Sequence, residues 1–168
     1  EGLESETRPH FFSGVVTVVH KLFKLCQPDA AIFGEKDYQQ LLVIKQMVSD
    51  HDMGIEILQG TTLRETDGLA MSSRNAYLND HQRKTAIHLN KIMRDLCNDY
   101  HSAQELNRLP SLEEEAIQKL LETGFTEIDY LTVRDADTLQ LPNTETKNLR
   151  LLAAVRLGKI RLIDNCAV

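Results

Sequence analysis

The feature that most constrains this sequence is a short apolar segment that leads through one glycine into a helical pattern. Residues Ala30–Phe33 are apolar, Gly34 follows, and the next apolar positions repeat with the period of a helix: Leu41, Ile44, Met47 and Val48. Gly54 then precedes a second apolar segment, Ile55–Leu58. A strand, a helix and a strand in this order predict a βαβ unit with a parallel strand pair, and hence an α/β fold.

The junction after the first predicted strand carries polar groups that suit an anionic ligand. A glycine there allows close approach to the backbone, and the start of the next helix offers unpaired N–H groups and a positive dipole end. Lys36 suits a phosphate or carboxylate, Asp37 suits ribose hydroxyls or Mg²⁺, and Gln40 could hydrogen-bond a polar substrate. Taken alone, these residues are equally compatible with a solvated loop.

A polar segment, Gln59–Asn75, separates this unit from a second region, and we expect the domain junction at about Glu65–Asn75. The junction contains Met71-Ser72-Ser73-Arg74, whose two hydroxyls and guanidinium form a compact candidate clamp for an oxyanion. A serine turn that caps the following helix is the alternative interpretation.

Periodicity and punctuation place the remaining elements. We expect helices over Gly14–Cys26 with Ser13 as N-cap, over a long segment capped by Asn79 or Asp80 that includes Thr85 to Cys97, and from a capping box at Ser111 and Glu114 to Gly124. Three strands are expected at Thr126–Val133, Leu149–Leu157 and Ile160–Asp164. Because Gly158-Lys159 fits a type II′ hairpin, this second sheet should be at least partly antiparallel.

Charge and cysteine spacing narrow the function classes. The 168 residues carry a net charge of −6, which argues against a broad surface for nucleic acid or an anionic membrane. The three cysteines, Cys26, Cys97 and Cys166, are far apart and lack CxxC spacing, so we expect buried free thiols in a reducing compartment. The six histidines show no ligand pairing, and no metal ligand is predicted. With no apolar run of transmembrane length, a cytoplasmic protein is expected.

Several strings together resemble one enzyme family. In order and spacing over nearly the whole chain, the sequence is similar to pantoate–β-alanine ligases in Phe33-Gly34-Glu35-Lys36-Asp37-Tyr38-Gln39-Gln40, Asp67-Gly68-Leu69-Ala70-Met71-Ser72-Ser73-Arg74-Asn75, Arg134-Asp135-Ala136-Asp137 and Leu162-Ile163-Asp164-Asn165. Only the C-terminal part of the family's sequence is present. Since the chain begins at Glu1 without methionine, we expect it to be a piece of a longer chain.

The resemblance implies a division into three parts: the C-terminal part of a Rossmann-like domain for ATP and pantoate (1–64), a hinge and phosphate-binding loop (65–75), and an α+β lid domain with an antiparallel sheet (76–168). It implies a ligase that joins (R)-pantoate to β-alanine. ATP and Mg²⁺ first give pantoyl adenylate and pyrophosphate, and the amine of β-alanine then displaces AMP. A homodimer is implied for the full-length enzyme, and activity should require the missing N-terminal half.

The resemblance also assigns residues. Gln40 is implied to bind pantoate, and Leu63 to contact adenine through its backbone. The groups implied to hold ATP are Gly34, Glu35, Lys36, Asp37, Met71, Ser72, Ser73 and Arg74, of which Lys36, Ser72, Ser73 and Arg74 are the candidate catalytic residues.

One position departs from the family pattern, because Phe11 occupies the usual histidine position and His10 precedes it. Two alternatives stay open. The chain could be a non-catalytic lid or scaffold fragment, or it could belong to a related nucleotidyltransferase that acts on another acid.

Overall fold

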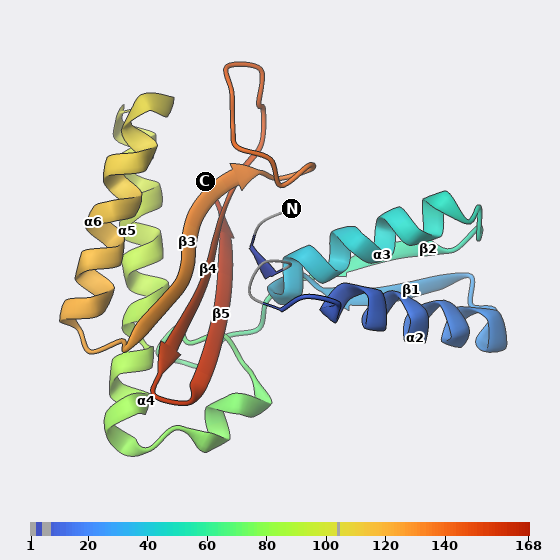
Figure 1. Cartoon of the computed structure of the whole chain (residues 1–168), viewed down its shortest axis with the longest axis horizontal. Coiled ribbons are helices and arrows are strands. Elements are labelled where there is room, and N and C mark those ends of the chain that lie inside the picture. The colour runs from blue at the N-terminus through green and yellow to red at the C-terminus, as the bar shows by residue number, and fades with distance from the viewer. Residues whose placement is uncertain (1–2, 5–7, 104) are drawn as a thin grey trace. The chain divides into compact units, whose positions relative to one another are not determined.

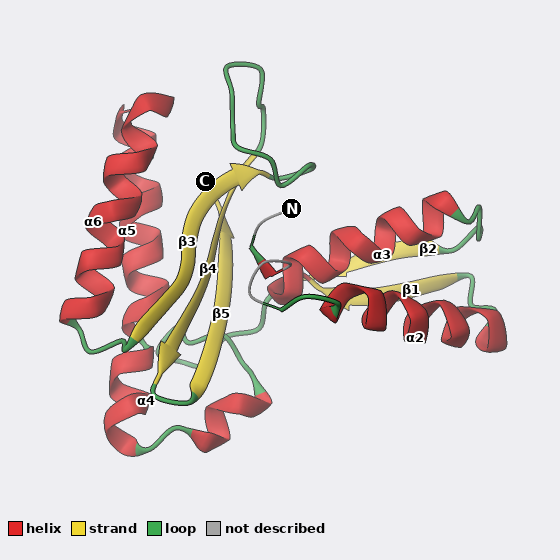
Figure 2. Cartoon of the chain, viewed as in Figure 1, coloured by secondary structure: helices red, strands yellow, loops and turns green. Residues whose placement is uncertain are grey.

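The computed structural model describes residues 3–4, 8–103 and 105–168, so the expectation drawn from Glu1 lies outside the described residues. The chain divides into two compact units, Glu1–Thr62 and Leu63–Val168, called here unit 1 and unit 2. Figure 1 follows the chain through both units, and Figure 2 shows that each combines helices with strands. No helix in the described ranges is both long and apolar enough to cross a membrane.

Unit 1 contains the predicted βαβ arrangement. Its elements are α2 (Phe11–Cys26), β1 (Ala30–Gly34), the 3₁₀ helix η1 (Glu35–Asp37), α3 (Tyr38–Asp50) and β2 (Glu56–Gly60). Strands β1 and β2 pair in parallel, with Ala30 opposite Glu56 and Gly34 opposite Gly60. The predicted parallel pair is therefore confirmed.

Both helices of unit 1 pack on one face of the strand pair. Phe23 of α2 meets Phe33 of β1 edge to face, with ring centroids 6.2 Å apart, and the fully buried Ile44 of α3 belongs to the same core. Because side chains alternate along a strand, the opposite face presents Ile32 and Leu58. These side chains are 71% and 39% exposed.

Helix α2 begins earlier than the sequence pattern predicted. Its first residue is Phe11, and His10 precedes it in a left-handed conformation with φ of 68°. The hydroxyl of Ser13 donates to the carbonyl of His10 at 2.8 Å, so Ser13 lies inside the first turn. The prediction of Ser13 as N-cap was wrong, because this serine bonds back to a carbonyl instead of accepting from a backbone amide.

Unit 2 is a three-stranded antiparallel sheet with helices on one face. The sheet has the order β3-β4-β5, and Figure 1 shows α5 and α6 alongside each other next to it. The elements are η2 (Ser73–Tyr77), α4 (Asp80–Ala86), α5 (His88–Ala103), η3 (Leu106–Arg108), α6 (Leu109–Glu122), β3 (Glu127–Asp135), β4 (Leu149–Leu157) and β5 (Ile160–Ala167). Leu89 and Met93 of α5, Leu120 of α6 and Leu151 of β4 are at most 1% exposed and form the core of this unit.

Two of the predicted helix boundaries need correction. The long helix after Asn79 is two helices, α4 and α5, although Asn79 caps the first of them with a capping box that includes Gln82. The capping box predicted at Ser111 was wrong. Helix α6 begins at Leu109 with Pro110 in its first turn, where proline is favoured, and the Ser111 hydroxyl donates to the carbonyl of Arg108 at 2.9 Å.

The end of the sheet agrees with the predicted hairpin. Leu157 pairs with Ile160, and of the two residues between them only Gly158 has a positive φ, 61°. A type II′ turn has a positive φ at its first central residue alone, so Gly158-Lys159 fits that type.

A buried ion network lies within the same sheet. The carboxylate of Asp129 is 4% exposed and accepts from Arg156 at 2.9 Å and from Arg161 at 2.5 Å. Burial alone raises the pKa of Asp129, but the hydrogen bonds and charges of the two guanidinium groups outweigh it and hold the pKa below its usual value.

Candidate functional site

The predicted ligand junction of unit 1 lies at the carboxyl ends of both parallel strands, where Gly34 and Gly60 face each other. A Cβ on Gly34 meets none of the described atoms within 4 Å, whereas a Cβ on Gly60 lies 3.4 Å from Cγ2 of Ile32. The backbone at Gly34 is therefore open to a ligand, and Gly60 keeps the neighbouring strand end close. Ligands of open parallel sheets bind at this end.

A hydrogen-bonded chain of side chains connects the junction to β2. The carboxylate of Glu35 accepts from the amide of Gln59 at 2.6 Å, and the Gln59 oxygen lies 3.5 Å from Nζ of Lys45. Lys36 is half-buried and Asp37 is exposed, immediately before α3. The sequence interpretation missed Gln59 and Lys45. The sequence could have indicated Gln59, because it is a polar residue at the carboxyl end of the second strand, where ligands of parallel sheets bind.

The two amides at the start of α3 have different environments. Gln39 is 7% exposed, and its side-chain oxygen accepts from the backbone N–H of Glu4 at 3.2 Å. Gln40, the predicted substrate residue, is half-buried. Gln39 therefore has a structural partner, which leaves Gln40 as the candidate for a ligand contact.

At the start of unit 2 the chain forms a short hairpin, residues 63–71, here called the entry hairpin. The N–H of Met71 donates to the carbonyl of Leu63 at 2.9 Å, and the N–H of Glu65 donates to the carbonyl of Leu69 at 2.8 Å. Gly68, with φ of 89°, completes the turn that Asp67-Gly68 predicted. The side chains of Leu63 and Met71 are 70% and 50% exposed.

An ion pair fastens the entry hairpin to β5. Arg64 donates to both carboxylate oxygens of Asp164, at 2.7 and 2.9 Å, and also to the carbonyl of Gly68 at 3.1 Å. The Asp164 side chain is 2% exposed. Sequence reasoning missed this pair, since the partners are 100 residues apart. The available signal was an aspartate inside an apolar strand, which requires a partner when buried.

A second, more exposed ion pair lies at the tip of the hairpin. Asp67 accepts from the N–H of Leu69 at 3.2 Å and from Arg83 at 2.6 Å. Burial raises the pKa of Asp67, but the Leu69 amide and the Arg83 guanidinium outweigh it, so the pKa lies below its usual value. Both side chains are about one-third exposed, and solvent screens their attraction.

The predicted oxyanion clamp follows directly. The Ser72 hydroxyl oxygen accepts from the N–H of Arg74 at 3.3 Å and so caps η2, while the side chains of Ser73 and Arg74 are exposed. The serine turn and the clamp are thus compatible, because the Ser72 hydroxyl keeps its own proton for a ligand.

Asn75 fixes this loop and was missed as a site residue. Its side-chain amide donates to the carbonyl of Ala70 at 3.1 Å, and its N–H donates to the carbonyl of Ser72 at 3.0 Å. Within the described part of the chain, its buried side-chain oxygen finds no donor. A buried acceptor of this kind costs free energy unless a water or ligand supplies a proton.

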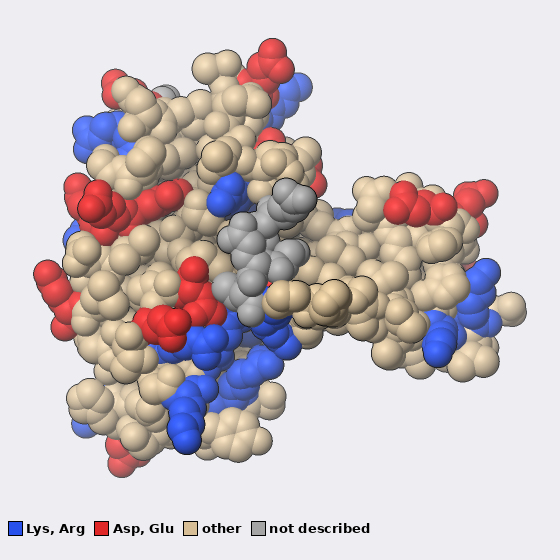
Figure 3. Space-filling model, viewed as in Figure 1, with Lys and Arg blue, Asp and Glu red and all other residues tan. Residues whose placement is uncertain are grey.

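Charge on the surface of unit 2 is uneven. Figure 3 shows lysine and arginine side chains gathered on the face around η2 and the hairpin between β4 and β5. A local concentration of positive charge favours an anionic ligand although the whole chain carries −6.

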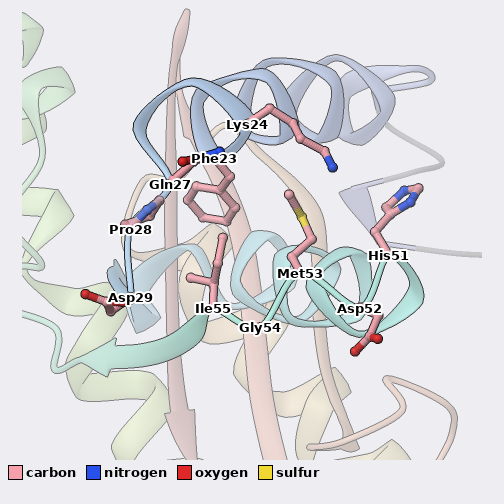
Figure 4. Close-up of a pocket in the computed structure, with 10 residues that line it drawn as sticks. All are labelled: Phe23, Lys24, Gln27, Pro28, Asp29, His51, Asp52, Met53, Gly54 and Ile55. Atoms are coloured by element: carbon pink, nitrogen blue, oxygen red, sulfur yellow. The ribbon is translucent and has the colours of Figure 1, made fainter.

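The cavity in Figure 4 lies elsewhere in unit 1. It has a volume of about 390 Å³, and Phe23 and Ile55 point toward one another across it. Its lining comes from the end of α2 and the segments that precede β1 and β2, and therefore from the amino ends of the strands. Since ligands bind at the carboxyl ends of such strands, we assign this cavity no role in ligand binding.

The potential metal ligands and the three cysteines are the remaining candidate groups. No group of three or more potential ligand side chains of the His, Cys, Asp or Glu type occurs in the described ranges. All three cysteines are free; Cys97 is buried and Cys166 partly so, but Cys26 is exposed, which corrects the expectation that every thiol is buried.

Comparison with known proteins decides the family. The model of the pantoate-beta-alanine ligase family matches residues 1–167. The chain belongs to this family. The resemblance noted in the sequence is therefore confirmed. The fold class is confirmed as well, because a solved structure of the family aligns with 99% of this chain and so covers both the α/β unit and the antiparallel unit.

Individual relatives give the extent of the match. Pantothenate synthetase from Bradyrhizobium sp. (strain BTAi1) is 46% identical over 168 residues, and the protein from Maricaulis maris is 49% identical over 170. The alignments cover 99% of this chain but only 58% and 57% of those proteins. The chain thus spans somewhat more than half the length of these curated relatives.

Solved structures agree. Pantothenate synthetase from Thermus thermophilus aligns with a TM-score of 0.87 at 38% identity, over 99% of this chain and 61% of that one. The Francisella tularensis ligase, described as complexed with beta-gamma ATP and beta-alanine, aligns with a TM-score of 0.70 at 34% identity, over 99% and 54%.

Proposed function

We propose that this chain supplies the C-terminal part of a pantoate–β-alanine ligase. In that reaction ATP activates (R)-pantoate as an acyl adenylate with release of pyrophosphate, and the amine of β-alanine then displaces AMP. The observation that carries the proposal is the family match over residues 1–167, within which the anion-binding junction and the oxyanion clamp are both present.

Unit 1 is assigned the nucleotide and the acid. The open backbone at Gly34 gives a phosphate or ribose room to approach, and Lys36 and Asp37 follow within one turn at the start of a helix. Glu35 is held by Gln59, so it supports this arrangement from β2. Gln40 is assigned to pantoate, since Gln39 already bonds the backbone of Glu4.

Unit 2 is assigned the adenine edge and the triphosphate. Leu63 lies at the start of the entry hairpin, and its backbone is assigned to the base; the exposed side chain of Met71, whose N–H donates to the carbonyl of Leu63, adds apolar surface beside it. Ser72, Ser73 and Arg74 are assigned to the phosphates, with two hydroxyl donors and one guanidinium. The unpartnered oxygen of Asn75 makes it an additional candidate in the same loop.

The chemistry needs fixed positive charge more than a nucleophile of the protein. Pantoate and ATP are both anionic, so Lys36 and Arg74 lower the repulsion between them and stabilise the charge that develops on the phosphate. Mg²⁺ binds proteins through one or two carboxylates together with substrate phosphates, and the exposed Asp37 fits that ligand type. Bound there, the ion would neutralise the departing pyrophosphate.

We also propose that residues 65–75 act as hinge and phosphate loop and residues 76–168 as a lid, and that the complete enzyme is a cytoplasmic homodimer. Because the chain covers 58% of the Bradyrhizobium relative, activity should require the remainder of a ligase polypeptide. The chain alone is expected to be inactive.

An activity assay of a fusion protein tests the proposal. The chain is fused to the N-terminal part of the Bradyrhizobium relative that the alignment leaves uncovered, and ATP–pyrophosphate exchange is measured with and without pantoate. The parent relative and the chain alone serve as controls. We expect exchange that depends on pantoate in the fusion and none in the chain alone.

Each contrary result has a distinct meaning. Exchange that ignores pantoate but follows another carboxylic acid would replace the proposed substrate and favour a related nucleotidyltransferase. A folded fusion that lacks all exchange, beside an active parent, would favour a non-catalytic fragment. Exchange by the chain alone would refute the proposed need for the N-terminal part.

A further inference from the structure

Unit 2 brings two cysteines together that are distant in the sequence. Sγ of Cys97, on α5, lies 3.4 Å from Sγ of Cys166, on β5, and 69 positions separate them. Both are free thiols. A disulfide requires sulfur atoms at about 2.05 Å, so a shift of little more than one ångström brings them to bonding distance.

A cavity gives reagents access to this pair. It has a volume of about 420 Å³, and its lining includes Arg64, Arg94 and both cysteines. Arg64 is ion-paired with Asp164, so Arg94 is the remaining arginine in the lining. Its lining contains none of the acidic side chains that the structure describes. A small anionic molecule is therefore favoured there over a neutral or cationic one.

The pKa values of the two thiols shift in opposite directions. The hydrogen bond from Cys166 lowers the pKa of Cys97 despite its burial, while the same interaction, together with burial, raises the pKa of Cys166 far above its usual value. The thiolate is the nucleophile in thiol–disulfide exchange. These pKa directions favour Cys97 as the attacking group and Cys166 as the resolving one.

We propose that Cys97 and Cys166 form a dithiol modification site, which small disulfides that carry carboxylates, of the glutathione disulfide class, oxidise to an intramolecular disulfide. Cys97 loses its proton and attacks one sulfur of the reagent; the reagent's S–S bond breaks, and the first thiol leaves. Cys166 then loses its proton and attacks the Cys97 sulfur of the mixed disulfide, and the second thiol leaves. The two protons from the cysteines appear on the two released thiols, and the two electrons reduce the reagent.

The disulfide would tie α5 to β5, next to Asp164, which holds the entry hairpin through Arg64. A crosslink over this many residues restricts the unfolded chain strongly. For a unit of about 100 residues this should raise the Tm of the oxidised form by about 10 °C or more.

The third cysteine supplies an internal control. Cys26 is exposed at the end of α2, and the sequence of unit 1 contains no other cysteine. It can form a mixed disulfide with the reagent or a bond between two chains, but no intramolecular bond within its unit. The substitution Cys26→Ser therefore isolates the proposed pair without a change to any residue assigned to the ligand sites.

The whole chain with Cys26→Ser is incubated with glutathione disulfide, quenched in acid, alkylated and digested for mass spectrometry. We expect a mass lower by two hydrogens, both thiols protected, and one peptide pair joined through Cys97 and Cys166. The unsubstituted chain should give the same joined peptides, so the result does not depend on how a variant folds. Three results would each overturn the proposal. They are two separate glutathione adducts that persist, crosslinks only between chains, and free thiols in the folded chain under conditions in which the urea-unfolded chain has reacted.

Two further arms separate mechanism from proximity. Adding Cys166→Ser should trap the mixed disulfide on Cys97, and samples of the intact pair that are quenched early should carry the first adduct on Cys97 and not on Cys166. Glutathione disulfide should also react several-fold faster than the cationic disulfide cystamine, and Arg94→Gln should reduce this preference. Equal reactivity of the two cysteines would refute the assigned order, and equal rates for the two reagents would refute the charge selection.

Discussion

The Arg64–Asp164 pair gives the sharpest test of how unit 2 is held together. Asp164→Ala leaves a guanidinium that is 27% exposed and so regains part of its hydration. Arg64→Ala leaves a carboxylate that is 2% exposed, whose remaining hydrogen bond within the described residues comes from the neighbouring Asn165 N–H at 2.8 Å. Breaking a buried pair by removal of one partner costs about 3–5 kcal/mol. We expect Arg64→Ala near the upper end and Asp164→Ala near the lower.

The double variant decides whether the loss belongs to the pair. Arg64→Ala with Asp164→Ala should destabilise by about 1–3 kcal/mol less than the two single losses added together, because no orphaned charge is left. The apolar pair Arg64→Met with Asp164→Leu should come close to the original stability. The control is Arg83→Ala, which breaks the exposed pair with Asp67 and should cost less than about 1 kcal/mol.

The free energy of unfolding is read in urea by far-UV circular dichroism. Hydrogen exchange of the buried amides of β4 then assigns the transition to unit 2. If Arg64→Ala costs no more than Arg83→Ala, or if the two single losses add without coupling, the reasoning from burial and bidentate geometry is refuted.

Other parts of the structure give four more predictions. In the fused ligase, Lys36→Ala should lower the ATP–pyrophosphate exchange rate by a factor of about 10²–10³, whereas unchanged kinetics would make Lys36 a surface residue. Gln40→Ala should raise the KM for pantoate strongly and leave that for ATP within a few-fold; an equal loss of both would contradict its assignment. The pKa of Asp129 is lowered in the folded state, so its ionised form stabilises the fold above the unfolded pKa of about 3.9. This stability should be lost as pH falls through the folded pKa, and Asp129→Asn should therefore make the free energy of unfolding in urea less dependent on pH below about pH 4. In the chain alone, amides of β1 should exchange faster than those of β4.

Local patterns predicted what depends on neighbours in the sequence. The strand, glycine and helix around Gly34 follow from apolar spacing, and the hairpin at Gly158 follows from turn chemistry. Where two local signals competed, the pattern failed, because Pro110 sets the start of α6 and thereby turns Ser111 from a cap into a residue of the first turn.

Long-range pairing was outside the reach of such patterns. Nothing near Arg64 indicates that its partner is on β5, and nothing near Cys97 indicates Cys166. Each of these side chains would be ordinary on a surface. Their ion pairing and thiol contact depend on the fold of unit 2, because the antiparallel sheet and the helix that covers it bring these distant residues together.

The expected exchange of β1 follows from how few partners the strand pair of unit 1 has. Of the described strands only β2 pairs with β1, whereas β4 is paired on both sides and almost entirely buried. Parallel strands are normally covered on both faces, yet here Ile32 is 71% exposed and Leu25 of α2 is 82% exposed. An open edge beside apolar surface favours either local opening or pairing with a second copy. Sedimentation combined with hydrogen exchange separates these outcomes: fast exchange in a monomer indicates opening, and protection that grows with concentration indicates self-association before Leu63. Protection of β1 equal to that of β4 in a dilute monomer would refute the argument, because two strands and two helices would then suffice.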